Sequence, residues 1–218
     1  MINRDYILRM IEQLSRFLSR ALLLKDGKEY LEAATEVKKA GEMFLGLNPE
    51  AMDALSDKDL IHLWRVAHDL DAEKCALAAQ IFRAEGEIYE DQGEQEKALA
   101  SYCKSLSLLT ETVNFLKEKI PSELIASVDF LMKHLDAETL PFDLQHKVFI
   151  TYTTIGRFAK AEDLLFEMVE EDASFVEEGR RFYGELLKRT DEELERGNLP
   201  RAEVLESLSQ LNKVNRSL

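Results

Sequence analysis

The clearest pattern in the chain is a helical spacing of apolar positions over residues 2–25. Apolar side chains recur there at steps of four and three residues, at Ile7, Ile11, Leu14, Leu18 and Ala21. This spacing places them on one face of an α-helix, and the opposite face is rich in arginine. We expect this N-terminal amphipathic helix to pack its apolar stripe against the next helix. Binding of the helix to a membrane surface or to a partner is the alternative.

Helix start and stop signals predict further helices along the first half. A second helix should run from about Lys28 to Leu45, after a break at Asp26-Gly27 and before Asn48-Pro49, because the residue before a proline avoids helical geometry. Residues 56–59 resemble a capping box. We expect the helix that follows them to include Ile61, Trp64 and Val66.

Two longer helices are predicted next. Asp71 is expected to cap a helix over residues 72–92, and Gly93 should end it in the left-handed conformation. Residues 94–118 should then form one long helix, closed by Ile120-Pro121. Residues 148–155 are β-branched and aromatic, and in isolation they favour a strand. We nevertheless predict a helix over 147–155, because the residues around it fit a helical repeat.

Residues 82–102 match the pattern of a tetratricopeptide repeat, a 34-residue pair of antiparallel helices. The matching positions are Phe82, Gly86, Tyr89, Gly93, Ala98 and Tyr102. Glu85 stands where the pattern has leucine, and Thr110 stands where it has the closing proline. Small residues at 86 and 98 would let the two helices cross closely, while the aromatic side chains fill the space beside them.

Two weaker units follow the first. One matches at Tyr152, Gly156, Ala161 and Leu165, with Phe149 in the usual glycine place, and residues 197–202 would suit a terminal capping hairpin. We therefore predict an all-α protein of stacked tetratricopeptide-like hairpins, an α-solenoid, preceded by the amphipathic helix. It would form a single domain over 1–218, with N-terminal helices over 1–70, the best unit over 71–120 and degenerate units over 121–218.

Composition narrows the class of partner. The 218 residues are 45% hydrophobic and include only 4 prolines and 9 glycines, so no flexible linker is expected. A formal net charge of −14 argues against nucleic-acid binding, which requires a basic face. The sequence has no signal-peptide pattern and no apolar run of membrane-spanning length. We expect a soluble cytoplasmic protein whose two cysteines are reduced.

No group of residues indicates catalysis or metal binding. The four histidines are scattered, and the sequence contains no HExxH, no glycine-rich phosphate loop and no G-x-S-x-G. Neither cysteine is accompanied by a recognisable base. The prediction is therefore a protein without enzymatic activity, metal or cofactor.

The candidate binding surface is the exposed face of the first helix in each repeat unit. The first unit presents Gln80, Arg83, Glu87, Glu90 and Asp91, and the second presents Asp143, His146, Ile150, Thr153 and Thr154. A mostly acidic groove would attract a basic or mixed-charge peptide. The alternative is a surface that is merely exposed. Glu87 and Ile150 stand where the carboxylate-clamp subtype of these repeats has asparagines, which argues against that subtype.

Several short segments carry a resemblance over nearly the whole chain. They are residues 3–7 and 10–13, then 44–48 and 55–60, and later 159–167 and 197–200. The chain resembles an uncharacterised family of bacterial helical proteins, mostly from Gram-positive species. The resemblance implies tetratricopeptide-like helices and a cytoplasmic protein, and it implies no activity, substrate or site.

Two classes of function fit these features. The first is a non-enzymatic protein- or peptide-binding module, with neither nucleic acid nor membrane as its partner and with self-association through the N-terminal helix as an open alternative. The second is a cytoplasmic receptor for a small signalling peptide that regulates another protein. The only basic segment is a single helix, which argues against a DNA-contacting version of that receptor.

Overall fold

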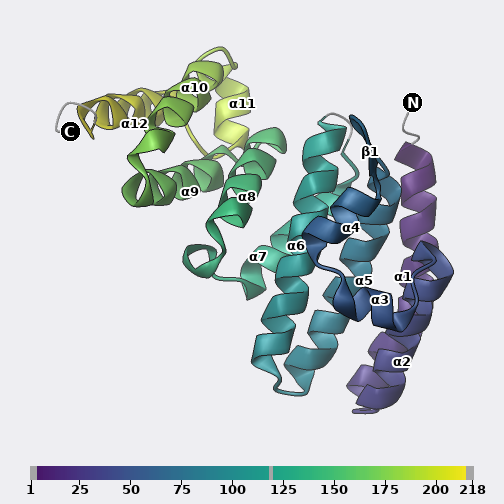
Figure 1. Cartoon of the computed structure of the whole chain (residues 1–218). Coiled ribbons are helices and arrows are strands. Elements are labelled where there is room, and N and C mark those ends of the chain that lie inside the picture. The colour runs from purple at the N-terminus through teal and green to yellow at the C-terminus, as the bar shows by residue number, and fades with distance from the viewer. Residues whose placement is uncertain (1–3, 118–119, 215–218) are drawn as a thin grey trace. The chain divides into compact units, whose positions relative to one another are not determined.

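Helices make up nearly all of the computed structural model, which describes residues 4–117 and 120–214 (Figure 1). Within these residues there are twelve α-helices and one short β-hairpin, so the predicted all-α class is confirmed. The chain divides into two compact units, unit 1 over Met1–Asp136 and unit 2 over Ala137–Leu218. The unit boundary falls within the range that the sequence grouped as 121–218.

Unit 1 contains seven of these helices. They are α1 (Arg4–Asp26), α2 (Tyr30–Ala40), α3 (Pro49–Ala54), α4 (Asp57–Leu63), α5 (Ala72–Asp91), α6 (Gln95–Leu116) and α7 (Ser122–His134). A π-helical turn over Gly41–Leu45 extends α2, so the predicted second helix is present in two parts. Parts of two predicted helices lie outside the described residues. They are residues 2 and 3 of the helix over 2–25 and residue 118 of the helix over 94–118.

The apolar stripe of α1 is buried in unit 1. Ile7, Ile11, Leu14, Leu18 and Ala21 are all at most 6% exposed. Helix α1 packs against α2 and α5, which confirms the prediction that the stripe docks on neighbouring helices. Any contact of α1 with a partner therefore has to use the opposite, arginine-bearing face.

Capping residues start and end the helices where the sequence placed them. The Ser56 side chain and Asp59 form the reciprocal bonds of a capping box at the start of α4. At the start of α5, the Asp71 carboxylate accepts a hydrogen bond of 3.1 Å from the backbone N–H of Lys74. Gly93 has φ +78° after the end of α5, as predicted.

The predicted helix through Ile61, Trp64 and Val66 is wrong in its second half. Helix α4 ends at Leu63, and a two-stranded hairpin follows, with β1 (Arg65–Val66) antiparallel to β2 (Asp69–Leu70). Ala67 has φ +55°, so the chain turns back there instead of continuing the helix. After this turn, the backbone N–H of Asp71 donates a hydrogen bond of 2.9 Å to the carbonyl oxygen of Trp64, directly ahead of α5.

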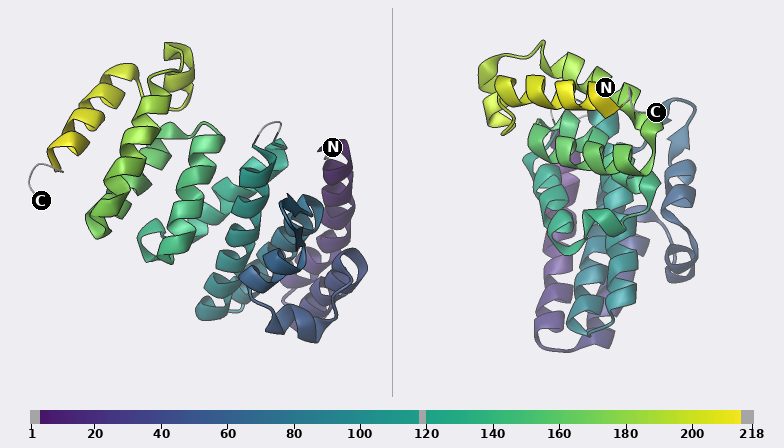
Figure 2. Two further views of the ribbon diagram at one scale, coloured as in Figure 1. Left: turned by 45° about the horizontal axis from the view of Figure 1, so that its top comes forward. Right: turned by 90° about the vertical axis from the view of Figure 1, so that its left-hand side faces the viewer.

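Helices α5 and α6 form the central antiparallel hairpin of unit 1 (Figure 2). They cross closely at Gly86, where a Cβ atom would lie 2.5 Å from Cδ1 of the Tyr102 ring. Ala98 is 1% exposed. Gly86 and Tyr102 of the sequence pattern therefore meet where α5 and α6 approach closely.

Unit 2 contains the remaining five helices. They are α8 (Phe142–Thr154), α9 (Phe158–Glu171), α10 (Val176–Leu186), α11 (Asp191–Arg196) and α12 (Arg201–Val214). Helix α8 packs against α9, and α10 packs against α12. The segment 147–155 is helical up to Thr154, as predicted. Its bulky side chains Val148, Phe149 and Tyr152 lie on the buried face, and this packing overrides their β propensity.

Candidate functional site

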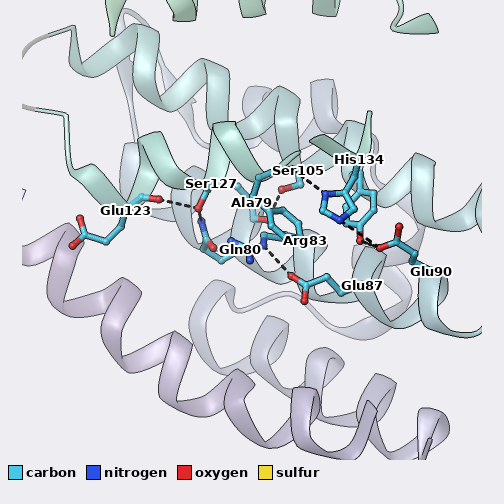
Figure 3. Close-up of polar contacts among 11 residues, drawn as sticks. Ala79, Gln80, Arg83, Glu87, Glu90, Ser105, Glu123, Ser127 and His134 are labelled. Atoms are coloured by element: carbon cyan, nitrogen blue, oxygen red, sulfur yellow. Dashed lines mark hydrogen bonds and ion pairs between the residues drawn. The ribbon is translucent and has the colours of Figure 1, made fainter. Parts of the chain in front are cut away.

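Three of the five predicted binding positions on α5, namely Gln80, Arg83 and Glu90, contact α7 within unit 1. Gln80 Nε2 donates to Ser127 Oγ at 2.9 Å, and Ser127 Oγ donates to the Glu123 carbonyl oxygen at 2.9 Å (Figure 3). Arg83 Nε donates to Glu87 Oε1 at 2.9 Å. The same guanidinium group lies over the Phe130 ring, 3.7 Å from its centroid. These side chains therefore take part in packing between two helices.

Glu90 belongs to the same contact region. Its Oε2 atom accepts a hydrogen bond of 2.7 Å from the Tyr102 hydroxyl and lies 3.8 Å from His134 Nε2 (Figure 3). Burial, and next the bond to Glu90, raise the pKa of Tyr102 well above its usual range. Asp91 accepts a hydrogen bond of 2.9 Å from the hydroxyl of Tyr30 on α2. The five α5 positions thus have polar or aromatic partners inside unit 1, which the sequence did not indicate.

The predicted positions on α8 belong to unit 2. His146 Nε2 lies 2.9 Å from Glu178 Oε1 on α10, and its ring lies edge-on to Phe175 with centroids 5.4 Å apart. Asp143 and Ile150 are exposed, and Ile150 is 36% exposed. Thr153 and Thr154 each donate to the carbonyl oxygen four residues earlier, at 2.9 and 2.7 Å. Each unit therefore holds its own part of the predicted row.

A different surface of α5 lines two hollows in unit 1. With 3.6 residues per turn, Glu85 and Tyr89 lie nearly opposite Arg83 and Glu87 around the helix. The first hollow, of about 240 Å³, has walls from α2 and α5, chiefly Tyr30, Leu31, Ala34, Val37, Lys38, Glu85, Ile88 and Tyr89. The second, of about 290 Å³, adds α3 and α6 and is lined by Met52, Asp53, Phe82, Glu85, Tyr89, Lys97, Ala100, Ser101 and Lys104. Glu85 and Tyr89 line both hollows, and we call the two together the Glu85 groove.

Glu85 is a partly buried carboxylate with a single hydrogen-bond donor. Its Oε2 atom accepts from Ser101 Oγ at 2.8 Å, and no described residue forms an ion pair with it. Burial raises the pKa of Glu85 above its usual value, and the nearby negative charge of Asp53 adds to the rise. The Ser101 bond and the positive charges of Lys104 and Lys38 act in the opposite direction. A carboxylate perturbed in this way in a cleft is a feature of binding and active sites.

The lysines beside Glu85 have other partners. Lys38 Nζ lies 2.9 Å from Asp53 Oδ2 on α3. Lys104 Nζ donates to the Met52 carbonyl oxygen at 3.1 Å and lies 4.3 Å from the centroid of the Phe82 ring. Burial lowers the pKa of Lys104. The groove therefore holds fixed cations together with one carboxylate that lacks a direct cationic partner.

The groove presents carboxylate, ammonium, hydroxyl and phenol groups. Among the described residues, no three His, Cys, Asp or Glu side chains converge in a way that could hold a metal ion. Cys75 and Cys103 are free thiols, and burial raises the pKa of Cys75 to about 12, which makes it a poor nucleophile.

The sequence contained one signal for this groove. Glu85 stands where the repeat pattern has leucine, and a charge at a position that normally packs apolar side chains indicates either a defect or a function. The predicted binding row does not include Glu85. Tyr30, Leu31 and Asp53 gave no signal, because their place beside Glu85 depends on how α2 and α3 pack against α5.

Comparison with known proteins gives one match. Residues 1–216 match the model of a family of unknown function, DUF6483. The chain belongs to this family. No curated protein matches it significantly, and neither does any solved structure. Among the helices in the described part of the chain, none combines the length and apolar character that a membrane span requires.

Proposed function

We propose that the protein is a non-enzymatic module that binds a peptide or an extended segment of a protein in the cytoplasm, without a cofactor. In this proposal the helices form tetratricopeptide-like hairpins, an α-solenoid, and the partner is not a nucleic acid or a membrane. Support comes from the α5–α6 hairpin, where Gly86, Ala98 and Tyr102 occupy the close crossing that the repeat pattern requires. The resemblance to bacterial, mostly Gram-positive, proteins makes such a host the natural source of a partner.

The Glu85 groove is the observation that carries this proposal. It joins apolar side chains, two tyrosines and several charged groups along one surface of α5. Leu31 at its edge is 82% exposed, an unusual position for a large apolar side chain. Apolar contacts with a few placed polar groups are the features that bind peptides and small ligands.

A selection of displayed random peptides on the full 218-residue chain tests the proposal. We expect selected peptides to bind the wild type and to lose at least about tenfold in affinity with Leu31→Ser, because this substitution removes an apolar contact of about 1.4 kcal/mol or more at the groove edge without adding a charge. Leu23→Ser is the matched control, since Leu23 is 71% exposed on α1 and lines neither hollow. Failure to enrich any peptide, or equal effects of the two variants, would contradict the proposal.

A further inference from the structure

The Glu85 carboxylate is the chemically distinctive group of the groove. It reaches both hollows, and within the described part of unit 1 only the Ser101 hydroxyl donates to it. A partly buried carboxylate accepts several hydrogen bonds when ionised, and it is most stable when a cation or further donors meet it. The groove therefore offers an acceptor to which the described residues supply a single donor.

The approach to Glu85 from the α2 side is largely aliphatic. Leu31, Ala34 and Val37 on α2 and Ile88 on α5 line the first hollow, beside the polar side chains of Tyr30 and Lys38. An occupant that reaches Glu85 from this side has to pass an aliphatic surface before its end meets the carboxylate. Lysine and arginine side chains have this character, because an aliphatic stem carries a charged tip.

We propose that the Glu85 groove binds a lysine or arginine side chain of the bound peptide, with its aliphatic stem between α2 and α5 and its cationic head on the Glu85 carboxylate. This inference rests on the proposed function, because it assigns the side chain that anchors the peptide. The pair that forms is a charge-assisted hydrogen bond in a partly desolvated site, which is stronger than a neutral one.

Charge complementarity favours a cation over an anion. Each lysine that lines the groove already has a partner. Lys38 is paired with Asp53, Lys97 is paired with Glu94, and Lys104 bonds to the Met52 carbonyl oxygen and covers the Phe82 ring. An incoming carboxylate would face Glu85 and Asp53, and it would have to displace these existing contacts. The formal net charge of −14 adds a long-range attraction for cationic ligands.

The raised pKa of Glu85 agrees with this geometry. Burial and the charge of Asp53 oppose ionisation in the free protein. A cation in contact with the carboxylate favours the ionised form, so binding should lower the pKa of Glu85 towards its ordinary value.

The test is an NMR titration of the full chain with three small probes. They are the N-acetyl, N-methylamide derivatives of arginine, norleucine and glutamate, which present a cationic, an apolar and an anionic side chain on the same backbone. We expect the arginine probe to shift the amide signals of Ala34, Tyr89 and Ser101 and to bind more tightly than the other two. In Glu85→Gln, which keeps an acceptor for Ser101, the affinity should fall about tenfold, as expected for loss of a charge-assisted bond.

Glu96→Gln is the control for general electrostatic attraction, because Glu96 is exposed on α6 and lines neither hollow. It should bind the arginine probe as the wild type does. Equal affinity of the wild type and Glu85→Gln, preference for norleucine or glutamate, or no saturable binding at tens of millimolar arginine probe would overturn the inference. Peptides that bind without a basic residue but are lost in Leu31→Ser would overturn it too, and they would leave the proposed function standing.

Discussion

The side chains of α5 have different partners around the helix. Arg83, Glu87 and Glu90 contact α7, α6 or each other, whereas Glu85 and Tyr89 face the groove. The first group is held by ring stacking and hydrogen bonds, which stabilise unit 1. Glu85 has the opposite effect at neutral pH, because a partly buried carboxylate without an ion pair loses hydration that one hydroxyl replaces only in part.

Arg83→Ala should lower the free energy of unfolding by about 1–2 kcal/mol, because it removes a cation–π contact at 3.7 Å and a partly buried ion pair. Arg196→Ala is the matched control. Arg196 also pairs with a glutamate four residues away, but both side chains are more than three-quarters exposed. Urea denaturation should show little change for the control. Equal midpoints for the two variants would show that the Phe130 contact contributes nothing.

The pH dependence of stability should identify Glu85. Because its pKa is raised by folding from an ordinary 4.5, the folded chain holds this proton more tightly than the unfolded chain. The stabilisation that protonated Glu85 contributes to the folded chain is fully present below pH 4.5. It is lost as pH rises through the raised pKa of Glu85 in the folded chain. The groups that face the carboxylate are the Ser101 hydroxyl, Asp53, Lys38 and Lys104.

Glu85→Leu removes this titration and restores the leucine of the repeat pattern. Its melting temperature should exceed that of the wild type, and the difference should grow as pH rises from 4.5 through the raised pKa of folded Glu85 and level off above it. Thermal melts at five or six pH values on both proteins provide the measurement. A difference that is constant with pH, or that shrinks as pH rises, would contradict the assigned pKa shift.

At the scale of elements, glycines allow close approaches in both units. Gly86 is needed where α5 meets the Tyr102 ring, and in unit 2 a Cβ at Gly197, directly after the end of α11, would lie 2.2 Å from Cδ2 of Phe158 at the start of α9. Both glycines belong to repeat matches in the sequence. The spacing of small and large residues therefore carries real information about which helices approach closely.

Gly86→Ala should lower the free energy of unfolding by about 1–3 kcal/mol, since the new methyl group overlaps the buried Tyr102 ring. Gly184→Ala on α10 is the matched substitution in a helix. A Cβ at Gly184 meets nothing within 4 Å, so alanine should stabilise by up to about 1 kcal/mol through its higher helix propensity. Opposite signs in chemical denaturation are expected. Stabilisation by both substitutions would contradict the close approach of α5 and α6 at Gly86.

Local signals explain which elements could be predicted from the sequence. The caps at Ser56, Asp71 and Gly93 act through neighbouring residues, and they were located correctly. The apolar stripe of α1 is equally clear in the sequence. Its spacing of four and three residues predicts a helix without any knowledge of the helices that pack against it. The prediction of a helix at Val66 is wrong because the hairpin pairing sets the turn at Ala67. Residues 148–154 are helical because tertiary packing overrides their β propensity.

At the scale of the whole molecule, the sequence predicted the helical class and not the groove. The Glu85 groove combines residues from α2, α3, α5 and α6, which are brought together by contacts distant in sequence. In the row that the sequence predicts as a binding surface, Gln80, Arg83 and Glu90 contact α7 and His146 contacts α10, whereas Asp143 and Ile150 are exposed. A repeat pattern specifies how neighbouring helices pair, but it does not specify which remaining face stays open.

The most direct test of the account is the affinity of Glu85→Leu for a peptide selected on the wild type, measured by isothermal titration calorimetry at pH 7.5. The account predicts a variant that is more stable than the wild type and binds the peptide at least about tenfold more weakly, because the cationic anchor loses its carboxylate. A stable variant that binds the peptide with wild-type affinity would contradict the claim that the Glu85 groove is the binding site.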